Sequence, residues 1–329
     1  MAMLPPMRLT GAKILCDGAL DAEAISVDGA VFSDAALPEV DLGGYLMLPG
    51  IVDLHGDAFE RHVAPRPTAP FPIATGLATT ERDAAAHGVT TAWLAQSWGW
   101  EGGRRGPDFA EAVMVALAAH NTHSLIDLRM QIRLETHMVE TRERLLAAVA
   151  AHGIDYVVFN NHLPEALKLA SRAPHRFAAW AEHDGRSVED FSARIEAAQE
   201  QAHAVPRHLL RLAEGFDALG VRFGSHDDPD ADTRERFRIL GARICEFPTT
   251  HSAAAAAKAM EDPVLMGAPN VVRGGSQAGG VSATHLITQG LCDALVSDYH
   301  YASLAEAAWV LADMKVLPFA RAWAMVSTV

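Results

Sequence analysis

The chain has 329 residues, half of them hydrophobic, and a formal net charge of −14 at pH 7. This length is sufficient for one large hydrophobic core, or for a large domain with a small one. The acidic balance argues against broad nucleic-acid binding, which needs a basic face to neutralise phosphates. It permits a small phosphorylated ligand in a local pocket.

The cysteines are odd in number and widely spaced, at Cys16, Cys245 and Cys292. This usage fits a reducing compartment better than a disulfide framework. No run of about eighteen apolar residues occurs, and the opening MAMLPPMRLT lacks the long apolar core of a secretory signal. We therefore expect a cytoplasmic protein without membrane insertion. A homodimer is compatible with the sequence, which does not define the oligomeric state.

Short strand-like runs such as AKILCDG and AISVDGAVFSD fill residues 8–47, separated by Asp-Gly pairs that favour tight hairpin turns. They predict a small β-sandwich module over residues 1–47. From Leu48 onwards, apolar β-branched runs alternate with helical stretches, the pattern of βα units around a parallel sheet. The expected strands are 51–55, 89–95, 128–135, 156–162, 221–226, 243–248, 264–270 and 294–300. The expected helices include 108–120, 140–152 and 187–205.

About eight strands over roughly 250 residues match the strand number and spacing of a (β/α)8 barrel. We therefore predict an α/β protein with a TIM-like barrel over residues 48–329. A doubly wound open sheet is the main competitor, but LHGD stands where its GxGxxG fingerprint would follow the first strand. The run 264–270 has a second interpretation as a substrate loop.

The stretch LPGIVDLHGD ends a strand in two polar residues, His55 and Asp57. Side chains at i and i+2 point to the same face of a strand, so these two would project together. An imidazole and a carboxylate at one point form half of a divalent metal site. The alternative is that His55 packs in the core and Asp57 caps the next segment.

Further histidines and carboxylates follow other expected strands: Glu135, His162, His226 and Asp298. In a barrel all these strand ends face one rim, where the loops build the active site. Three imidazoles and three carboxylates could hold two divalent ions, with one carboxylate bridging and water in the open positions. The pattern therefore predicts a binuclear hydrolytic centre.

Several motifs resemble a known family: HGDAFERH (55–62), RLETH (133–137), SHDDP (225–229), EFPTT (246–250), MGAPNVVRGGSQAGGVSA (266–283) and SDYHYAS (297–303). PGIVDLHGD and the last-strand SD resemble the amidohydrolase superfamily. The full set resembles its PhnM-type α-D-ribose 1-methylphosphonate 5-triphosphate diphosphatases, of the carbon–phosphorus lyase pathway. The resemblance implies hydrolysis of that triphosphate to 5-phosphoribosyl 1-methylphosphonate and pyrophosphate. Its substrate would be a small phosphorylated sugar.

Carried over to this chain, the resemblance makes His55, Asp57, Glu135, His162, His226 and Asp298 the metal ligands. Many superfamily members bridge their metals with a carboxylated lysine, but no lysine lies between Lys13 and Lys168. Glu135 is left as the bridging residue, with His137 as a substitute. A surface glutamate that starts a helix is the alternative interpretation of Glu135.

Two cations at this site would lower the pKa of a bridging water, supply hydroxide for attack on phosphorus and offset charge on the phosphate oxygens. Asp298 is the expected catalytic proton acceptor, as well as a ligand. Histidine and carboxylate ligands suit zinc, which we expect first, and also manganese, iron or nickel.

A triphosphate also needs hydrogen-bond donors away from the metals. In NVVRGGSQ, Arg273, Gly274, Gly275 and Gln277 could cradle phosphate, with Asn270 beside them. The alternative is a glycine-rich connection with a solvated arginine. Arg104 and Arg105 form a second cationic pair on an expected loop, open to the same two interpretations.

Three functions remain open at this point. The diphosphatase comes first, and a superfamily enzyme acting on a cyclic amide or an N-acyl bond comes second. A barrel that has lost catalysis and serves as an interaction module comes third, although the apparently full ligand set disfavours it. Superfamily members return at the carboxyl end to complete the small β module, so we expect this module to be incomplete here.

Overall fold

The computed structural model describes residues 5–66, 69–183 and 185–328. Its centre is an eight-stranded sheet in which every neighbouring pair is parallel and the strands follow one another in sequence order. This order confirms the barrel and excludes the doubly wound sheet, whose strand order reverses. The strands are β8 (Ile51–Gly56), β9 (Val89–Trp98), β10 (Asp127–Glu135), β11 (Tyr156–Asn160), β12 (Arg222–His226), β13 (Cys245–Glu246), β14 (Val264–Gly267) and β15 (Ala294–Val296).

The barrel closes where β8 meets the end of β15. Gly56 forms a parallel bridge with Asp298, and the buried carboxylate of Asp53 accepts hydrogen bonds from Ser297 N (2.8 Å) and Ser297 Oγ (2.6 Å). An added Cβ at Gly56 would lie 2.7 Å from Asp53 Oδ2, so only glycine fits this junction. At the other end of the two strands, Val326 O accepts from Val52 N.

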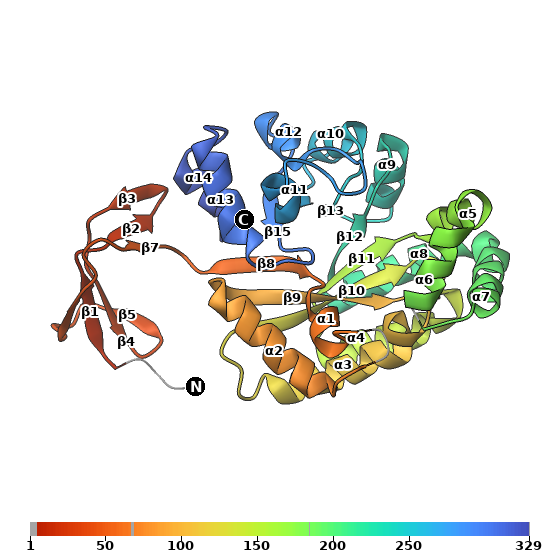
Figure 1. Cartoon of the computed structure of the whole chain (residues 1–329), viewed down its shortest axis with the longest axis horizontal. Helices are drawn as coiled ribbons and strands as arrows, with labels where there is room; N and C mark the ends of the chain where they lie inside the picture. Colours follow the sequence, from red (N-terminus) through yellow and green to blue (C-terminus); the bar gives the residue numbers. More distant parts are fainter. Residues whose placement is uncertain (1–4, 67–68, 184, 329) are drawn as a thin grey trace.

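Helices alternate with the strands, as Figure 1 shows. The expected helices 108–120 and 140–152 correspond to α3 and α4, and the expected strand 264–270 divides into β14 and a short helix, α11. The helices around the barrel are α1 (Phe59–Val63), α2 (Ile73–Ala86), α3 (Pro107–His120), α4 (Arg142–His152), α8 (Val205–Leu219), α9 (Ala231–Ile239), α10 (His251–Ala259), α11 (Ala268–Val272), α12 (Ala283–Thr288), α13 (Ser303–Asp313) and α14 (Phe319–Ala324).

Between β11 and β12 the chain forms an additional helical lobe. It consists of α5 (Leu163–Arg172), α6 (Pro174–His183) and α7 (Val188–Glu200), so the expected helix 187–205 ends at Glu200 and a 3-10 turn leads into α8. The lobe has its own hydrophobic cluster, in which Phe191 packs against Trp100 from the loop after β9. The lobe is therefore joined to the rim of the barrel.

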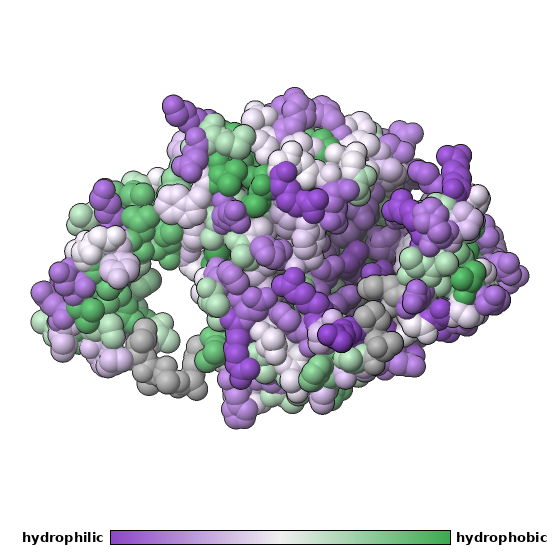
Figure 2. Space-filling model, viewed as in Figure 1, coloured by the Kyte–Doolittle hydropathy of each residue, from purple (hydrophilic) through white to green (hydrophobic). Residues whose placement is uncertain are grey.

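Residues 7–47 form two small sheets, one of order β5-β4-β1-β6 and one of order β3-β2-β7. They lie to one side of the barrel in Figure 1. Phe32 and Tyr45 are largely exposed there, and Figure 2 shows hydrophobic residues gathered over this part. The division into two domains after residue 47 stays a prediction. The strands are β1 (Met7–Thr10), β2 (Lys13–Cys16), β3 (Ala19–Asp21), β4 (Ile25–Asp28), β5 (Val31–Ser33), β6 (Glu39–Asp41) and β7 (Leu46–Met47).

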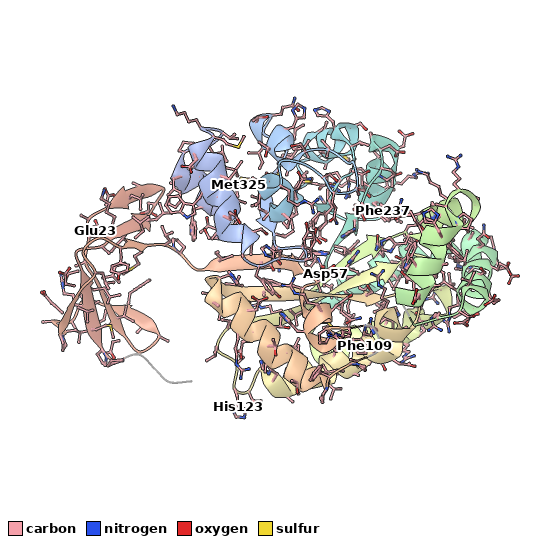
Figure 3. The ribbon with its side chains drawn as sticks, in the orientation of Figure 1. Glu23, Asp57, Phe109, His123, Phe237 and Met325 are labelled. Carbon is pink, nitrogen blue, oxygen red and sulfur yellow. The ribbon has the colours of Figure 1, made fainter. Side chains whose placement is uncertain are left out.

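The helices in the described part of the chain are all too short or too polar to cross a membrane. Hydrophilic residues gather around the hollow in the middle of the molecule in Figure 2. Figure 3 labels Asp57 near this centre, far from the small sheets that carry Glu23. The carboxyl end of β8 therefore opens into a polar depression.

Candidate metal centre

His55 lies at the end of β8 and is almost fully buried, with 1% of its surface exposed. Its Nδ1 lies 2.8 Å from Glu246 Oε2, at the end of β13. With Nδ1 protonated and directed at this carboxylate, Nε2 of His55 keeps its lone pair for a metal. Burial lowers the pKa of His55, but the charge of Glu246 and its hydrogen bond outweigh this, so the net shift is upward.

Glu246 is a residue that the sequence did not assign. Its Oε1 accepts hydrogen bonds from Gln131 Nε2 (2.7 Å) and the Tyr156 hydroxyl (2.5 Å). Burial raises the pKa of Glu246, but His55, the charge of His226 and the hydrogen bond from Tyr156 together lower it by more, so the net shift is downward. Glu246 could also be grouped with His55 and His226 as a metal ligand. Because its oxygens already have partners, we interpret it as the residue that orients His55.

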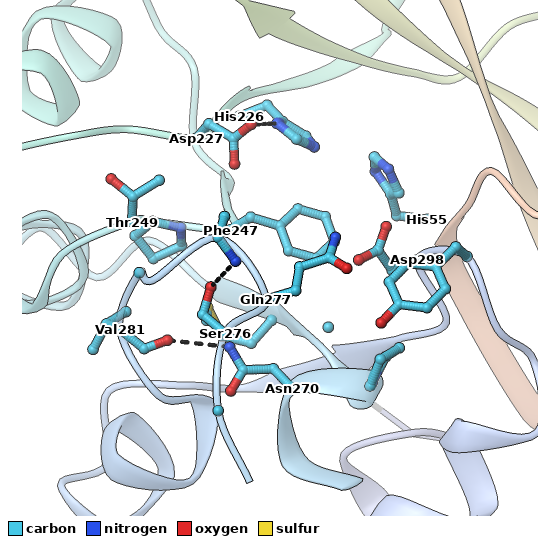
Figure 4. Close-up of a pocket in the computed structure, with 18 of the residues that line it drawn as sticks. His55, His226, Asp227, Phe247, Thr249, Asn270, Ser276, Gln277, Val281 and Asp298 are labelled. Atoms are coloured by element: carbon cyan, nitrogen blue, oxygen red, sulfur yellow. Dashed lines mark hydrogen bonds and ion pairs between the residues drawn. The ribbon is translucent and has the colours of Figure 1, made fainter. Parts of the chain in front are cut away.

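His226, at the end of β12, faces His55, and their ring centroids lie 5.1 Å apart. Its Nδ1 lies 3.0 Å from Asp227 Oδ2, so its Nε2 is also left for a ligand. Burial is the main cause that lowers the pKa of His226, which keeps the ring neutral as metal binding requires. In Figure 4 the two imidazoles lie near each other at the upper edge of the pocket.

Asp57 and Asp298 are held beside these histidines by the backbone. Asp57 N donates to Asp298 O (2.8 Å), and Asp298 N donates to His55 O (2.9 Å). Asp298 has a positive φ of 55°, a conformation that is uncommon outside glycine and is often found at functional sites. Burial and the nearby charge of Asp57 raise the pKa of Asp298 to about 7. Asp298 is thus suited to accept a proton near neutral pH.

His55, Asp57, His226 and Asp298 form the first group at this rim, and Glu135 and His162 form a second. His162 Nδ1 lies 2.7 Å from Glu135 Oε1, while Glu135 Oε2 accepts from His162 N and from Trp100 Nε1, each at 3.1 Å. Burial raises the pKa of Glu135, but His162 and the donors overcome this and the net shift is downward. Glu135 is therefore buried and ionised, and the surface interpretation is wrong. His137 hydrogen-bonds Thr136 Oγ1 and lies outside this group.

Glu101, on the loop after β9, joins this second group and was not predicted from the sequence. Each of Glu101, Glu135 and His162 offers one potential ligand atom, and these three atoms lie within 4.8 Å of one another. Burial, followed by the charge of Glu135, raises the pKa of Glu101 to about 7.

The second group fits a metal ion. Among the described residues, Glu101 Oε2 is buried without a hydrogen-bond partner, while Glu135 Oε1 has only the His162 imidazole, at 2.7 Å. An added Cβ at Gly99 would overlap Glu101 Oε2 and lie 3.3 Å from Glu135 Cγ, so glycine leaves the space that the two carboxylates use. Buried carboxylate oxygens without hydrogen-bond donors are rare because they cost free energy, and coordination to a cation can replace the missing hydrogen bond.

Arg133 lies between the two groups. It projects from β10 two residues before Glu135, hence on the same face, and its Nη1 lies 3.5 Å from Asp57 Oδ2. Its charge acts on the pKa of His55 in the first group and of His162 in the second. The alternation in QIRLE places Arg133 inward, and this signal could have identified it.

A cavity of about 480 Å³ opens above the first group. Of the predicted phosphate-binding residues, Arg273, Gly275, Gln277 and Asn270 line it, and Gly274 does not. Figure 4 shows the Gln277 side chain in this cavity beside Asp298. The amide of Asn270 is occupied: its Nδ2 donates to Val281 O (3.1 Å) and its Oδ1 accepts from Ala283 N (2.9 Å). Asn270 therefore holds the glycine-rich loop in place.

The chain was compared with known proteins. No protein-family model matches it. Over 305 residues it is 30% identical to the α-D-ribose 1-methylphosphonate 5-triphosphate diphosphatase of Escherichia coli (strain K12), covering 90% of this chain and 79% of that protein. The chain belongs to the α-D-ribose 1-methylphosphonate 5-triphosphate diphosphatase family. The resemblance found in its motifs is thereby confirmed.

Solved structures agree on the fold of this family member. An uncharacterized metal-dependent hydrolase from Pyrococcus furiosus superposes with a TM-score of 0.61 at 10% identity, covering 98% of this chain and 93% of that one. A D-hydantoinase gives a TM-score of 0.58 at 13% identity, with coverage of 98% and 80%. The barrel is therefore of the amidohydrolase type. Family and fold together support a hydrolase, and its buried His–carboxylate groups suggest divalent-metal binding.

Proposed function

We propose that this protein is a metal-dependent diphosphatase that hydrolyses α-D-ribose 1-methylphosphonate 5-triphosphate to 5-phosphoribosyl 1-methylphosphonate and pyrophosphate. The relative from Escherichia coli carries this activity in its name, at 30% identity over 90% of the chain. The observation that carries the proposal in the structure is Arg133, a cation held between two His–carboxylate groups at the barrel mouth. A guanidinium in this position is suited to bind phosphate oxygens, whereas a neutral cyclic amide offers it no negative charge.

The proposed binuclear centre would use both groups. His55, Asp57, His226 and Asp298 would hold one divalent ion, and Glu135 with His162 would hold or bridge to the other. Zinc is the first expectation, with manganese, iron or nickel as alternatives. When bound, the ions would lower the pKa of water and offset charge on the phosphate oxygens.

The residues of the chain itself have distinct tasks in this proposal. Asp298 takes the proton of the attacking water, from its position beside His55 at the carboxyl end of the last barrel strand. Arg133, from inside the barrel, and Arg273, from the rim of the cavity, bind phosphate oxygens through charge-assisted hydrogen bonds. Glu246 and Asp227 keep the imidazoles of His55 and His226 in one orientation.

The test is incubation of the metal-loaded protein with ribose 1-methylphosphonate 5-triphosphate, followed by phosphorus NMR. We expect pyrophosphate to appear in step with loss of the triphosphate. The variant Asp298→Asn, checked for unchanged folding, serves as the control for a contaminating phosphatase. Turnover of dihydroorotate or an N-acylated amine, with no pyrophosphate from the triphosphate, would instead favour the cyclic-amide or N-acyl hydrolase.

A further inference from the structure

We propose that Glu101 is a third protein ligand of the metal position formed by Glu135 and His162. The inference rests on the metal-dependent function proposed above and adds a residue to that site. Glu101 comes from the loop after the second barrel strand, and none of the sequence motifs contains it. The second metal position would thus draw its ligands from three consecutive βα units.

The geometry of the carboxylate is that of a ligand without its ion. Glu101 is 1% exposed, and its Oε1 lies 3.7 Å from His162 Nδ1. Its Oε2 is buried without a hydrogen-bond donor in the described part of the chain. A carboxylate usually accepts several hydrogen bonds when it is removed from water, and an oxygen left without a donor costs free energy. A cation placed among these three side chains would supply the missing interaction.

The charge at this position also favours a cation. Glu101 and Glu135 place two carboxylates beside one imidazole, so the group is negative even when His162 is protonated. Arg105 Nη1 lies 3.6 Å from Glu101 Oε1 and compensates one charge from the rim. With His162 neutral, as a metal ligand must be, one buried negative charge remains, and a divalent ion bound by carboxylate and imidazole is a common solution in proteins.

The loop is fixed so that this carboxylate points inward. Arg186, just before α7, donates from Nε to Glu101 O (2.6 Å), and Arg194 on α7 donates from Nη1 to Trp100 O (3.4 Å). An added Cβ at Gly102, whose φ is +72°, would overlap the guanidinium of Arg186. The helical lobe thus holds the backbone of the loop, while the indole of Trp100 holds Glu135.

The experiment measures metal binding independently of activity. Full-length wild type, Glu101→Gln and Glu101→Asp are stripped with a chelator and titrated with Mn²⁺, and bound metal is followed by electron paramagnetic resonance and elemental analysis. We expect two equivalents in the wild type. In Glu101→Gln the affinity for one equivalent should fall at least about tenfold while the other is retained, and Glu101→Asp should be intermediate. Glu81→Gln, a buried glutamate on α2, is the matched control and should keep both equivalents.

Two equivalents of unchanged affinity in Glu101→Gln would overturn the inference, even if that variant were less stable, because Glu101 would then only pair with Arg105. If Glu101→Gln does not fold, unchanged affinities in Glu101→Asp would overturn it equally. A single equivalent in the wild type would also overturn it. Loss of one equivalent in the variant, with no pyrophosphate released by the wild type, would support the ligand role and reject the proposed substrate instead.

Discussion

The two His–carboxylate groups at the barrel mouth differ in how far their polar atoms are satisfied by the protein. In the first group, Glu246 receives hydrogen bonds from Gln131 and Tyr156 and lies against His55. In the second group, Glu135 is held by His162 and Trp100, but the described residues leave Glu101 Oε2 buried without a donor. The carboxylate beside His55 is therefore fixed by the protein itself, whereas the Glu101 carboxylate of the second group lacks one partner that a cation would supply.

The difference matches the position of each group in the fold. The first group is built at the ends of β8, β12 and β15, with Glu246 on β13 and the donors to Glu246 on β10 and β11. The second takes Glu101 from a loop that the helical lobe holds from outside. We expect changes in the first group to alter chemistry and metal orientation, and changes in the second to alter metal occupancy and stability.

The largest effect is expected at Asp298, the proton acceptor of the first group. Asp298→Asn removes the base but keeps nearly the same shape, so kcat for pyrophosphate release should fall by about 10²–10⁴-fold. Steady-state kinetics with metal content measured on the same sample check this. A decrease of less than about tenfold at full metal occupancy would mean that another group accepts the proton.

The next effect concerns orientation in the first group. Glu246→Gln replaces the carboxylate beside His55 with a neutral amide and weakens its hold on the Nδ1 proton. The affinity for the metal at His55 should then fall by about 10–100-fold. Metal titration against a competing chelator measures this, and the second equivalent should be unaffected. Equal weakening of both equivalents would contradict the separation of the two groups.

Replacing each of the two arginines at the cavity should change the kinetics to a different extent. Arg133 is 11% exposed and lies between the groups, so Arg133→Met should raise KM or lower kcat by about 10–100-fold. Arg273 is exposed at the rim, where solvent screens its charge, so Arg273→Ala should change KM by less than about fivefold. Kinetics over a range of salt concentrations compare them. A larger kinetic effect of Arg273→Ala than of Arg133→Met would place the phosphates at the rim.

The smallest predicted effect concerns how the stability of the metal-free protein changes with pH. Glu101 and Asp298 each have a pKa of about 7 in the folded protein, raised first by burial and then by a neighbouring carboxylate. At pH values between the ordinary carboxyl pKa and 7, the folded state keeps protons that the unfolded chain has released. Stability of the metal-free protein should therefore fall as the pH rises through this window.

Thermal unfolding of chelator-treated protein at pH 5.5 and pH 8 measures this effect. Added metal binds the ionised carboxylates, so the stabilisation by metal should be larger at pH 8. Glu101→Gln is the control, because one of the two groups no longer titrates and the pH dependence should be weaker. If the pH dependence of stability is unchanged in Glu101→Gln, other titrating groups cause it.

The barrel was predictable because strand and helix periods, together with polar residues at strand ends, agree along the chain. The same reasoning identified His55, His226, Glu135 and His162, which the structure brings to one rim in two groups. Their metal-binding roles stay predictions.

Three residues escaped the sequence interpretation for different reasons. Glu101 lies on a loop with no periodic pattern, and its position depends on arginines about 85 and 94 residues away. Glu246 lies inside the expected strand 243–248, but the structure ends that strand at Glu246 itself, so its side chain was not recognised as one at a strand end. Arg133 was detectable, since it shares the inward face of β10 with Glu135.

The central claim is that the barrel mouth provides two metal positions, one at His55 and His226 and one at Glu135 and His162. Anomalous X-ray diffraction from crystals of the metal-loaded protein tests this most directly. The account predicts two anomalous peaks, one next to each pair. A single peak at the first pair, or a peak at neither pair, would contradict it.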